Sequence, residues 1–395
     1  MAAAPSLPEV AERIGVSPST LRRWLSAGVI PGMNGSSRWS PAAISHARIV
    51  ARLRERGHTL DQIREASRQG RLAYGFFEEL FPEPQEGRSL AQAAKEVGLE
   101  PALVERLWTS IGFQAQALEH VSDEELEALR HIASLLDTGF PLVAVLQLCR
   151  VYGQALAQIA DTEVRLFHIY VHEPLMRDGV PGLRMAEQME TLTRDALPFA
   201  SPLMDFVHQR FLQHYATQDV VGHMELDLDG EQDLDRLRVA IAFADLAGYT
   251  RFTEEEGEEE ALSSVERFVE GVTNTLPDEA RVVKTIGDEV MVVGSDPRAL
   301  VDWAVGFVGL FDERPEPRIG VHYGAAVYRD GDYFGREVNL ASRVVARARG
   351  GEVLVTDTVV DAVKGAGHLS FEGIGQVKLK GFDQPRQLCR AVARE

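Results

Sequence analysis

Cysteine and lysine are scarce in this 395-residue chain, and long uninterrupted runs of apolar residues are missing. The two cysteines, Cys149 and Cys389, are too few for a disulfide framework or a thiolate metal site. No apolar run approaches the roughly 18 residues of a membrane span, and the first 30 residues lack a signal-peptide pattern. We therefore expect a cytoplasmic protein without stable membrane insertion.

The composition is globular, but the charge is unevenly distributed. Hydrophobic residues make up 45% of the chain and charged residues 26%, and the length is sufficient for two or three domains. A net charge of −19 argues against a general nucleic-acid coat. Residues 6–71 are the exception, because eleven arginines against five acidic residues give this stretch a local charge of +6.

The first 150 residues contain an internal repeat. The motif residues Ser6, Gly15 and Pro18 recur 83 positions later as Ser89, Gly98 and Pro101. We therefore predict two tandem copies of one helical module, over residues 6–71 and 89–154. The second copy has four basic residues against nine acidic ones, so we expect it to bind a ligand or a partner rather than a phosphate backbone.

The first copy has the pattern of a helix-turn-helix. Apolar residues from Leu7 to Ile14 have helical spacing, and Ser17 followed by Pro18 is typical of a helix start. Residues 7–71 resemble the winged helix-turn-helix of MerR-type regulators. The resemblance implies DNA contacts from the second helix and the wing, at Ser19, Arg22, Arg23 and Arg38. A module reused as a scaffold would show the same pattern, so both interpretations stand.

Between the repeat and the C-terminal half, residues 155–222 show apolar periodicity typical of long helices that pack against a partner chain. An acidic stretch follows and indicates a linker. We predict four segments: residues 1–75 as the helix-turn-helix, 88–222 as a helical regulatory or dimerisation region, 223–237 as the linker, and 238–395 as a catalytic domain.

The C-terminal half places acidic residues at the ends of predicted strands. A buried strand from Val239 ends at Asp245, and the segment Leu246, Gly248, Tyr249 and Thr250 turns into a helix whose backbone amides can cradle phosphate oxygens. Residues 281–293 predict a β-hairpin with Asp288 at its tip. Two such carboxylates are suited to a pair of Mg²⁺ ions, which polarise the attacking and leaving oxygens in phosphoryl chemistry.

A third motif begins at Asp332 and continues into a helix on which Asn339 and Arg343 share one face. In order and spacing, the three motifs resemble the class III adenylyl/guanylyl cyclase catalytic domain, over about residues 238–392. The resemblance implies a ferredoxin-like α+β fold that works as a head-to-tail homodimer and converts ATP to 3′,5′-cyclic AMP and pyrophosphate. The expected fold class is thus multi-domain, all-α in its first half and α+β in its second.

The resemblance also implies residue roles. Asp245 and Asp288 would hold two divalent metal ions per site, Mg²⁺ or Mn²⁺. The other implied roles are adenine reading by Lys284 and Asp332, ribose orientation by Asn339, transition-state stabilisation by Arg343, and triphosphate binding by Lys380. A lysine donor and an aspartate acceptor match the N1 and N6 groups of adenine, whereas guanine leaves both mispaired.

Residues 40–235 resemble, more loosely, the regulatory domain of acid-sensing class III cyclases. That resemblance implies switching by pH and a lipid-like ligand, without identifying any ligand residue. Nine of the eleven histidines precede the catalytic domain, so we hypothesise that the full chain responds to pH more steeply than residues 236–395 alone. Ordinary surface or core histidines are the alternative. A nucleotide-sensing transcription regulator with a weak or inactive cyclase domain is the competing function.

Overall fold

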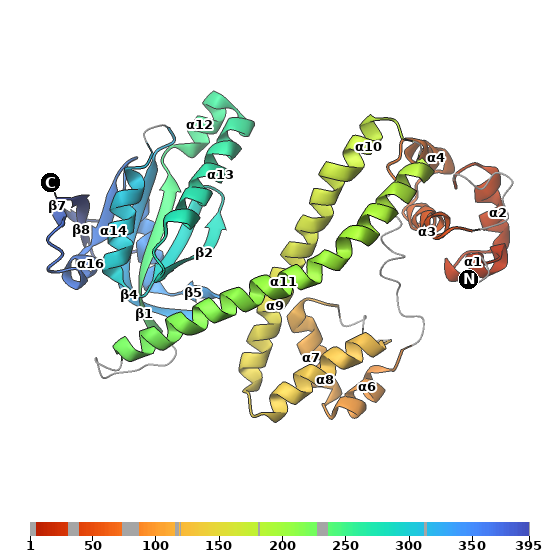
Figure 1. Ribbon diagram of the computed structural model, residues 1–395, viewed down its shortest axis with the longest axis horizontal. Helices are drawn as coiled ribbons and strands as arrows, with labels where there is room; N and C mark the ends of the chain where they lie inside the picture. Colours follow the sequence, from red (N-terminus) through yellow and green to blue (C-terminus); the bar gives the residue numbers. More distant parts are fainter. Residues whose placement is uncertain are drawn as a thin grey trace. The chain divides into compact units, whose positions relative to one another are not determined.

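The computed structural model describes residues 5–30, 39–72, 87–114, 118, 120–180, 182–226, 236–311 and 314–394. It divides into two compact units, Met1–Phe211 and Leu212–Glu395, here called the first and second unit (Figure 1). The predicted wing with Arg38 and most of the predicted linker lie outside the described residues.

The first repeat copy consists of α1 (Leu7–Arg13), α2 (Pro18–Ser26), α3 (Pro41–Glu55) and α4 (Leu60–Arg68). Ser17 caps α2 as predicted, because its side chain accepts the Thr20 N–H while Pro18 occupies the first turn. Leu21 and Trp24, on the apolar side of α2, pack into a core that α2 shares with α1, α3 and α4. The helix-turn-helix prediction is confirmed for the described part of the module.

The second copy follows the same order, with α6 (Leu90–Val97), α7 (Pro101–Ile111), α8 (Asp123–Asp137) and α9 (Leu142–Phe167). These helices begin 83, 83, 82 and 82 positions after α1, α2, α3 and α4, so the predicted repeat is confirmed. The counterpart of the short α4 is a helix of 26 residues. Gly153 lets α9 approach the end of α7, since a Cβ there would lie 1.7 Å from the Ile111 carbonyl oxygen.

Beyond α9 the chain forms a π-helical turn, η3 (His168–His172), then α10 (Glu173–Arg177) and the 45-residue α11 (Gly182–Leu226). Within the described chain, the stretch Leu142–Arg177 is long and apolar enough to cross a membrane by length and composition. In the sequence, polar and charged residues, among them Asp161 and Arg165, divide this stretch into shorter apolar runs. Those two side chains form an ion pair of 2.7 Å on the surface of α9.

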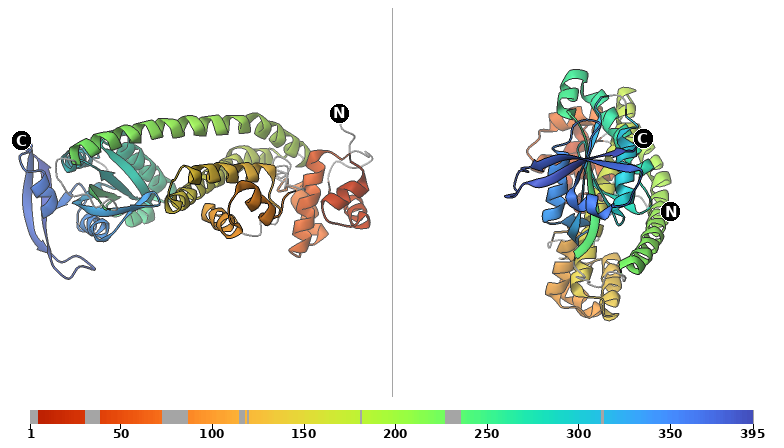
Figure 2. Two further views of the ribbon diagram at one scale, coloured as in Figure 1. Left: turned by 90° about the horizontal axis from the view of Figure 1, so that it is seen from below. Right: turned by 90° about the vertical axis from the view of Figure 1, so that its left-hand side faces the viewer.

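The second unit is built on one mixed β-sheet. Its strands are β1 (Arg236–Leu246), β2 (Ala280–Ile286), β3 (Glu289–Gly294), β4 (Pro317–Arg329), β5 (Asp332–Phe334), β6 (Val353–Thr356), β7 (Leu369–Val377) and β8 (Arg386–Ala393). The order is β2-β3-β1-β4-β6-β8-β7, with β5 paired to β4. Among the strands that the structure describes, β4 and β6 are the one pair that runs in parallel. Figure 2 shows β7 and β8 in dark blue at one end of the sheet.

Helices cover both faces of this sheet and complete its core. The helices are α12 (Tyr249–Glu256), α13 (Glu258–Thr275), α14 (Pro297–Val308), α15 (Arg336–Val345) and α16 (Asp357–Ala362). Phe268 of α13 and Phe307 of α14 are buried against one face, and Val338 and Val345 of α15 against the other. The predicted α+β fold is confirmed, as are the hairpin at residues 281–293 and the strand ending near Asp245.

Candidate active site

The two predicted metal-binding acids lie together at one end of the central strands. Asp245 is near the end of β1, and Asp288 is in the turn between β2 and β3. The pKa of Asp288 is raised to about 6, chiefly by burial and then by the neighbouring Asp245 carboxylate. Glu289, which pairs with Asp245 across the strands, has its pKa raised by the same two causes. The fold therefore brings carboxylates close together here, and a bound cation would reduce the repulsion between them.

Arg318 of β4 is a site residue that the sequence analysis missed. The antiparallel register of β1 and β4 places it opposite Asp245. Its Nε donates a hydrogen bond of 2.8 Å to Asp245 Oδ2, and its Nη1 lies 3.3 Å from the Ala348 carbonyl oxygen. Asp245 is only 9% exposed, so the guanidinium compensates a carboxylate that is almost buried.

The donor set fits a hard divalent cation. Among the residues that the structure describes, no group of three or more histidine, cysteine, aspartate or glutamate side chains has the arrangement of a metal site. Mg²⁺ is commonly held by one or two carboxylates together with substrate phosphates. Asp245 and Asp288 supply two such carboxylates, with phosphate oxygens left to complete the shell.

The start of α12 lies next to Asp245 in the chain. Gly248 caps this helix with a positive φ of 74°, a conformation that favours glycine. The backbone amides of the first helical turn have no acceptors within the helix, and they attract anions. Of the predicted substrate-binding residues here, Leu246 is buried, Tyr249 is half-buried and Thr250 is exposed. A hollow of about 270 Å³ lies beside Gly248, and its lining includes Arg251 and Arg314.

Lys284 and Asp332 form the second part of the site. The Lys284 ammonium makes an ion pair with Asp332 Oδ2, and the Tyr333 N–H donates a hydrogen bond of 2.7 Å to Asp332 Oδ1. Both charged side chains stay partly exposed, Lys284 at 36% and Asp332 at 24%. The structure thus brings together the donor and the acceptor that the sequence predicted, although the residues are 48 positions apart.

Asn339 and Arg343 lie on the exposed side of α15, whose opposite side is buried on the sheet. Gly320 of β4 makes this close packing possible, because a Cβ there would lie 2.2 Å from the Val345 nitrogen. Lys380 is exposed in the segment between β7 and β8. None of these three side chains is buried in the unit, so all are accessible to a ligand or to a second chain.

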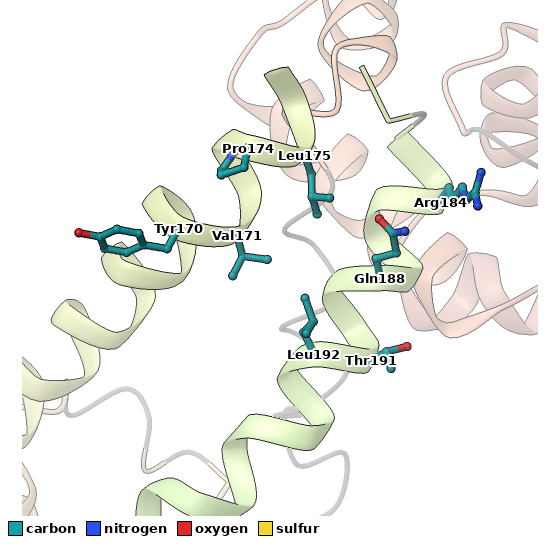
Figure 3. Close-up of a pocket in the computed structure, with 8 residues that line it drawn as sticks. All are labelled: Tyr170, Val171, Pro174, Leu175, Arg184, Gln188, Thr191 and Leu192. Atoms are coloured by element: carbon teal, nitrogen blue, oxygen red, sulfur yellow. The ribbon is translucent and has the colours of Figure 1, made fainter. Parts of the chain in front are cut away.

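Two features of the first unit bear on its predicted partners. Ser19, Arg22 and Arg23 are all exposed on α2, where the sequence analysis expected DNA contacts. A cavity of about 660 Å³ lies between the η3–α10 stretch and α11, lined by Tyr170, Val171, Pro174, Leu175, Arg184, Gln188, Thr191 and Leu192. Figure 3 shows Leu175 and Leu192 pointing toward each other across the space between the two helices.

Comparisons with known proteins agree with this architecture. Residues 233–389 match the adenylate and guanylate cyclase catalytic domain, and residues 6–69 match the MerR HTH family regulatory protein. The chain is similar to an adenylate cyclase of Streptomyces coelicolor, with 33% identity over 273 residues, which is 67% of this chain and 68% of that protein.

Two further similarities extend over different parts of the chain. A pH-sensitive adenylate cyclase of Mycobacterium tuberculosis is 29% identical over 329 residues, covering 82% of this chain and 81% of that protein. The crystal structure of the adenylyl cyclase CyaB from P. aeruginosa has 24% identity and a TM-score of 0.37, covering 40% of this chain and 96% of that one. With the identity to the Streptomyces protein and the two domain matches, the chain belongs to the class III adenylate and guanylate cyclase family and carries a MerR-like helix-turn-helix in its first half.

Proposed function

We propose that this protein is an adenylate cyclase that converts ATP to 3′,5′-cyclic AMP and pyrophosphate. The observation that carries the proposal is the Lys284–Asp332 ion pair on the same chain as the adjacent acids Asp245 and Asp288. The first pair is suited to adenine and the second to the cations that accompany a triphosphate. The relatives named as adenylate cyclases support the same reaction.

Asp245 and Asp288 would hold two Mg²⁺ or Mn²⁺ ions. When bound, such ions stabilise negative charge on the reacting phosphate oxygens. Around them, the first-turn amides of α12 orient the triphosphate, and Arg318 and Lys380 add positive charge to the same end of the substrate. The hollow beside Gly248 supports a place for the triphosphate at the start of α12.

The 3′-hydroxyl of ATP attacks the α-phosphorus, the bond to the β,γ-pyrophosphate breaks, and the hydroxyl proton leaves to solvent. Lys284 donates to adenine N1, and Asp332 accepts from the N6 amine. Asn339 orients the ribose so that the hydroxyl faces the phosphorus, and Arg343 stabilises the charge that develops during transfer.

The complete residue set on one chain favours a symmetric, head-to-tail homodimer with two equivalent sites. In such a dimer one protomer supplies the acids Asp245 and Asp288, and the other supplies Arg343. The exposed positions of Asn339 and Arg343 support sharing, because a second chain can reach both.

The reaction and the shared site can be tested together. Purified full-length protein incubated with ATP and Mn²⁺ should release cyclic AMP. Asp245→Ala and Arg343→Ala should each be inactive, whereas the mixed heterodimer should recover one working site. A complete lack of cyclic AMP from the wild type would contradict the proposed activity and favour a nucleotide-sensing regulator. Active wild type with no recovery in verified heterodimers would contradict only the shared site.

The first unit would regulate the second as a cytoplasmic dimerisation and sensing region. Its cavity is mostly apolar at Leu175 and Leu192 and carries Arg184 at one side, a combination suited to a lipid-like ligand with an acidic head group. Regulation by pH is the other component of this proposal, supported by the similarity to a relative named as pH-sensitive.

DNA binding is a second candidate function of the first unit. The exposed Ser19, Arg22 and Arg23 on the second helix of the helix-turn-helix favour it. If it holds, retardation of genomic fragments at low salt should weaken steeply as salt increases, and Arg22→Ala with Arg23→Ala should weaken it further. No retardation at low salt would leave the scaffold interpretation.

A further inference from the structure

Arg281 of β2 lies in a cluster of three tyrosines within the second unit. Its guanidinium carbon is 5.2 Å from the centre of the Tyr215 ring and 5.6 Å from those of Tyr328 and Tyr333. Its Nη2 also donates a hydrogen bond of 3.0 Å to the Tyr333 hydroxyl. We call these four residues the Arg281 cluster. A planar guanidinium can stack on several rings at once, which an ammonium cannot do equally well.

The Arg281 cluster touches both elements that carry the Lys284–Asp332 pair. Arg281 is three residues before Lys284 on β2, and the strand has a bulge between them, where its register to β3 shifts. Tyr333 directly follows Asp332 on β5, and it is only 5% exposed. A shift of Arg281 would therefore move the lysine strand and the aspartate strand relative to each other.

The strand β5 depends strongly on this anchoring. It has three residues and pairs with β4 through a two-residue turn at Asp330 and Gly331, both with positive φ. Such a short edge strand has few hydrogen bonds of its own to fix it. The buried ring of Tyr333, held by Arg281 and by the Tyr328 ring at 5.1 Å, is thus what sets the position of Asp332.

The fourth member of the cluster, Tyr215, comes from α11. The part of α11 from Leu212 onward belongs to the same compact unit as the sheet. We propose that Arg281 is a positioning residue for the base-reading pair and that Tyr215 holds it in place, so that this segment of α11 controls how tightly and how selectively the site binds adenine. This inference rests on the proposed function, because it assigns a support to the proposed base-reading residues.

The test uses the full-length protein and compares ATP with GTP. Arg281→Met should raise the KM for ATP and lower the preference for ATP over GTP, each by about tenfold, while kcat changes less, because the variant loses the stabilising contacts with three rings. Tyr215→Leu should have the same effects at about threefold, and Tyr215→Phe, which keeps the ring, should retain the wild-type preference.

The matched control is Arg238→Met, which removes another arginine–ring contact of the same sheet, 5.0 Å from Tyr323. It should leave KM and base preference unchanged. A loss of kcat alone in Arg281→Met, or equal behaviour of Tyr215→Leu and Tyr215→Phe, would overturn the inference. If Arg281→Met does not fold, the two Tyr215 variants decide the question.

A parallel variant separates this inference from the proposed function. Lys284→Glu with Asp332→Cys inverts the base-reading groups themselves. If that variant keeps wild-type ATP use, the base-reading assignment is wrong. If it loses ATP preference while the Arg281 and Tyr215 variants keep theirs, the base reading stands and only the support from α11 is wrong.

Discussion

The two units place their apolar side chains differently. In the second unit the aromatic side chains Phe268 and Phe307 of the covering helices are fully buried between the sheet and its helices. In the first unit the long helices leave theirs outside, with Phe199 73% exposed and Leu203 and Phe206 each 61% exposed on α11. Exposed apolar surface of this extent marks an interaction site. The second unit thus has a complete core and exposed site residues, whereas the long helices of the first unit have exposed apolar surfaces suited to binding another chain.

This difference predicts that variants of the second unit change turnover, and variants of the long helices change assembly. The largest effect is expected at Asp288. Asp288→Asn should lower cyclic AMP formation by about 10³-fold, as expected for the loss of a preorganised charge at the reacting phosphate. Dimer formation should be unchanged, which sedimentation of the variant would check. If Asp288→Asn forms cyclic AMP at the wild-type rate, the assignment of Asp288 as a metal ligand is wrong.

The same variant also has a pH signature in the metal-free protein. The pKa of Asp288 is raised in the fold, so the folded state binds more protons than the unfolded state between about pH 4 and 6, and the wild type loses stability as the pH rises through that window. Asp288→Asn lacks this loss. Its melting temperature should exceed that of the wild type at pH 8, and the difference should vanish near pH 4. An unchanged difference across the range would contradict the burial of this carboxyl.

The second largest effect concerns the choice of base. Lys284→Glu with Asp332→Cys should lower the ratio of ATP to GTP use by about 10²-fold or more, because sites built to hydrogen-bond a substrate reject one that leaves those groups unpaired by up to about 10⁴–10⁵. Initial rates with each nucleotide in Mn²⁺ measure the ratio. Lys364→Glu, at a surface lysine that pairs with Asp361, serves as the control and should leave the ratio unchanged.

Much of the fold could be predicted because its signals are local. Ser17 with Pro18 marks the start of α2, and the repeat offset places each helix of the second copy from the first. Asp245, Asp288 and Lys284 belong to short sequence motifs, so their positions at strand ends and in the hairpin could be predicted too. Arg318 was missed because its contact with Asp245 depends on the pairing of strands 73 residues apart. The Arg281 cluster was missed for a similar reason, since it joins a helix and three strands.

The next prediction tests the exposed surface of the first unit. Phe206→Glu should weaken dimerisation about 10–100-fold, since burying such a side chain contributes about 1.5–3 kcal/mol. Ser201→Glu adds the same charge to the other side of α11 and should have little effect. Sedimentation equilibrium of both variants measures the change. Equal dissociation constants would mean that the Phe206 face of α11 does not contact the second chain.

The smallest effect is expected at a histidine inside the helix-turn-helix. His46 is 9% exposed, and its Nε2 donates a hydrogen bond of 3.0 Å to the Val29 carbonyl oxygen. Burial lowers the pKa of His46, so the unfolded module binds a proton more readily than the folded one. The module should therefore lose stability as the pH falls below about 6.5. Its equilibrium constant for local unfolding should increase by at most about tenfold for each pH unit.

Hydrogen exchange of peptides covering α2 and α3 measures this loss without requiring the rest of the chain to unfold. After correction for the intrinsic exchange rate, protection in the wild type should decrease from pH 7.5 to 5.5. His46→Gln keeps a hydrogen-bond donor but cannot take up a proton, so its protection should change less over the same range. His58→Gln, at an exposed position of the same module, should follow the wild type. If His46→Gln also follows the wild type, the acid response of the first unit arises at other residues, and the helix-turn-helix takes no part in it.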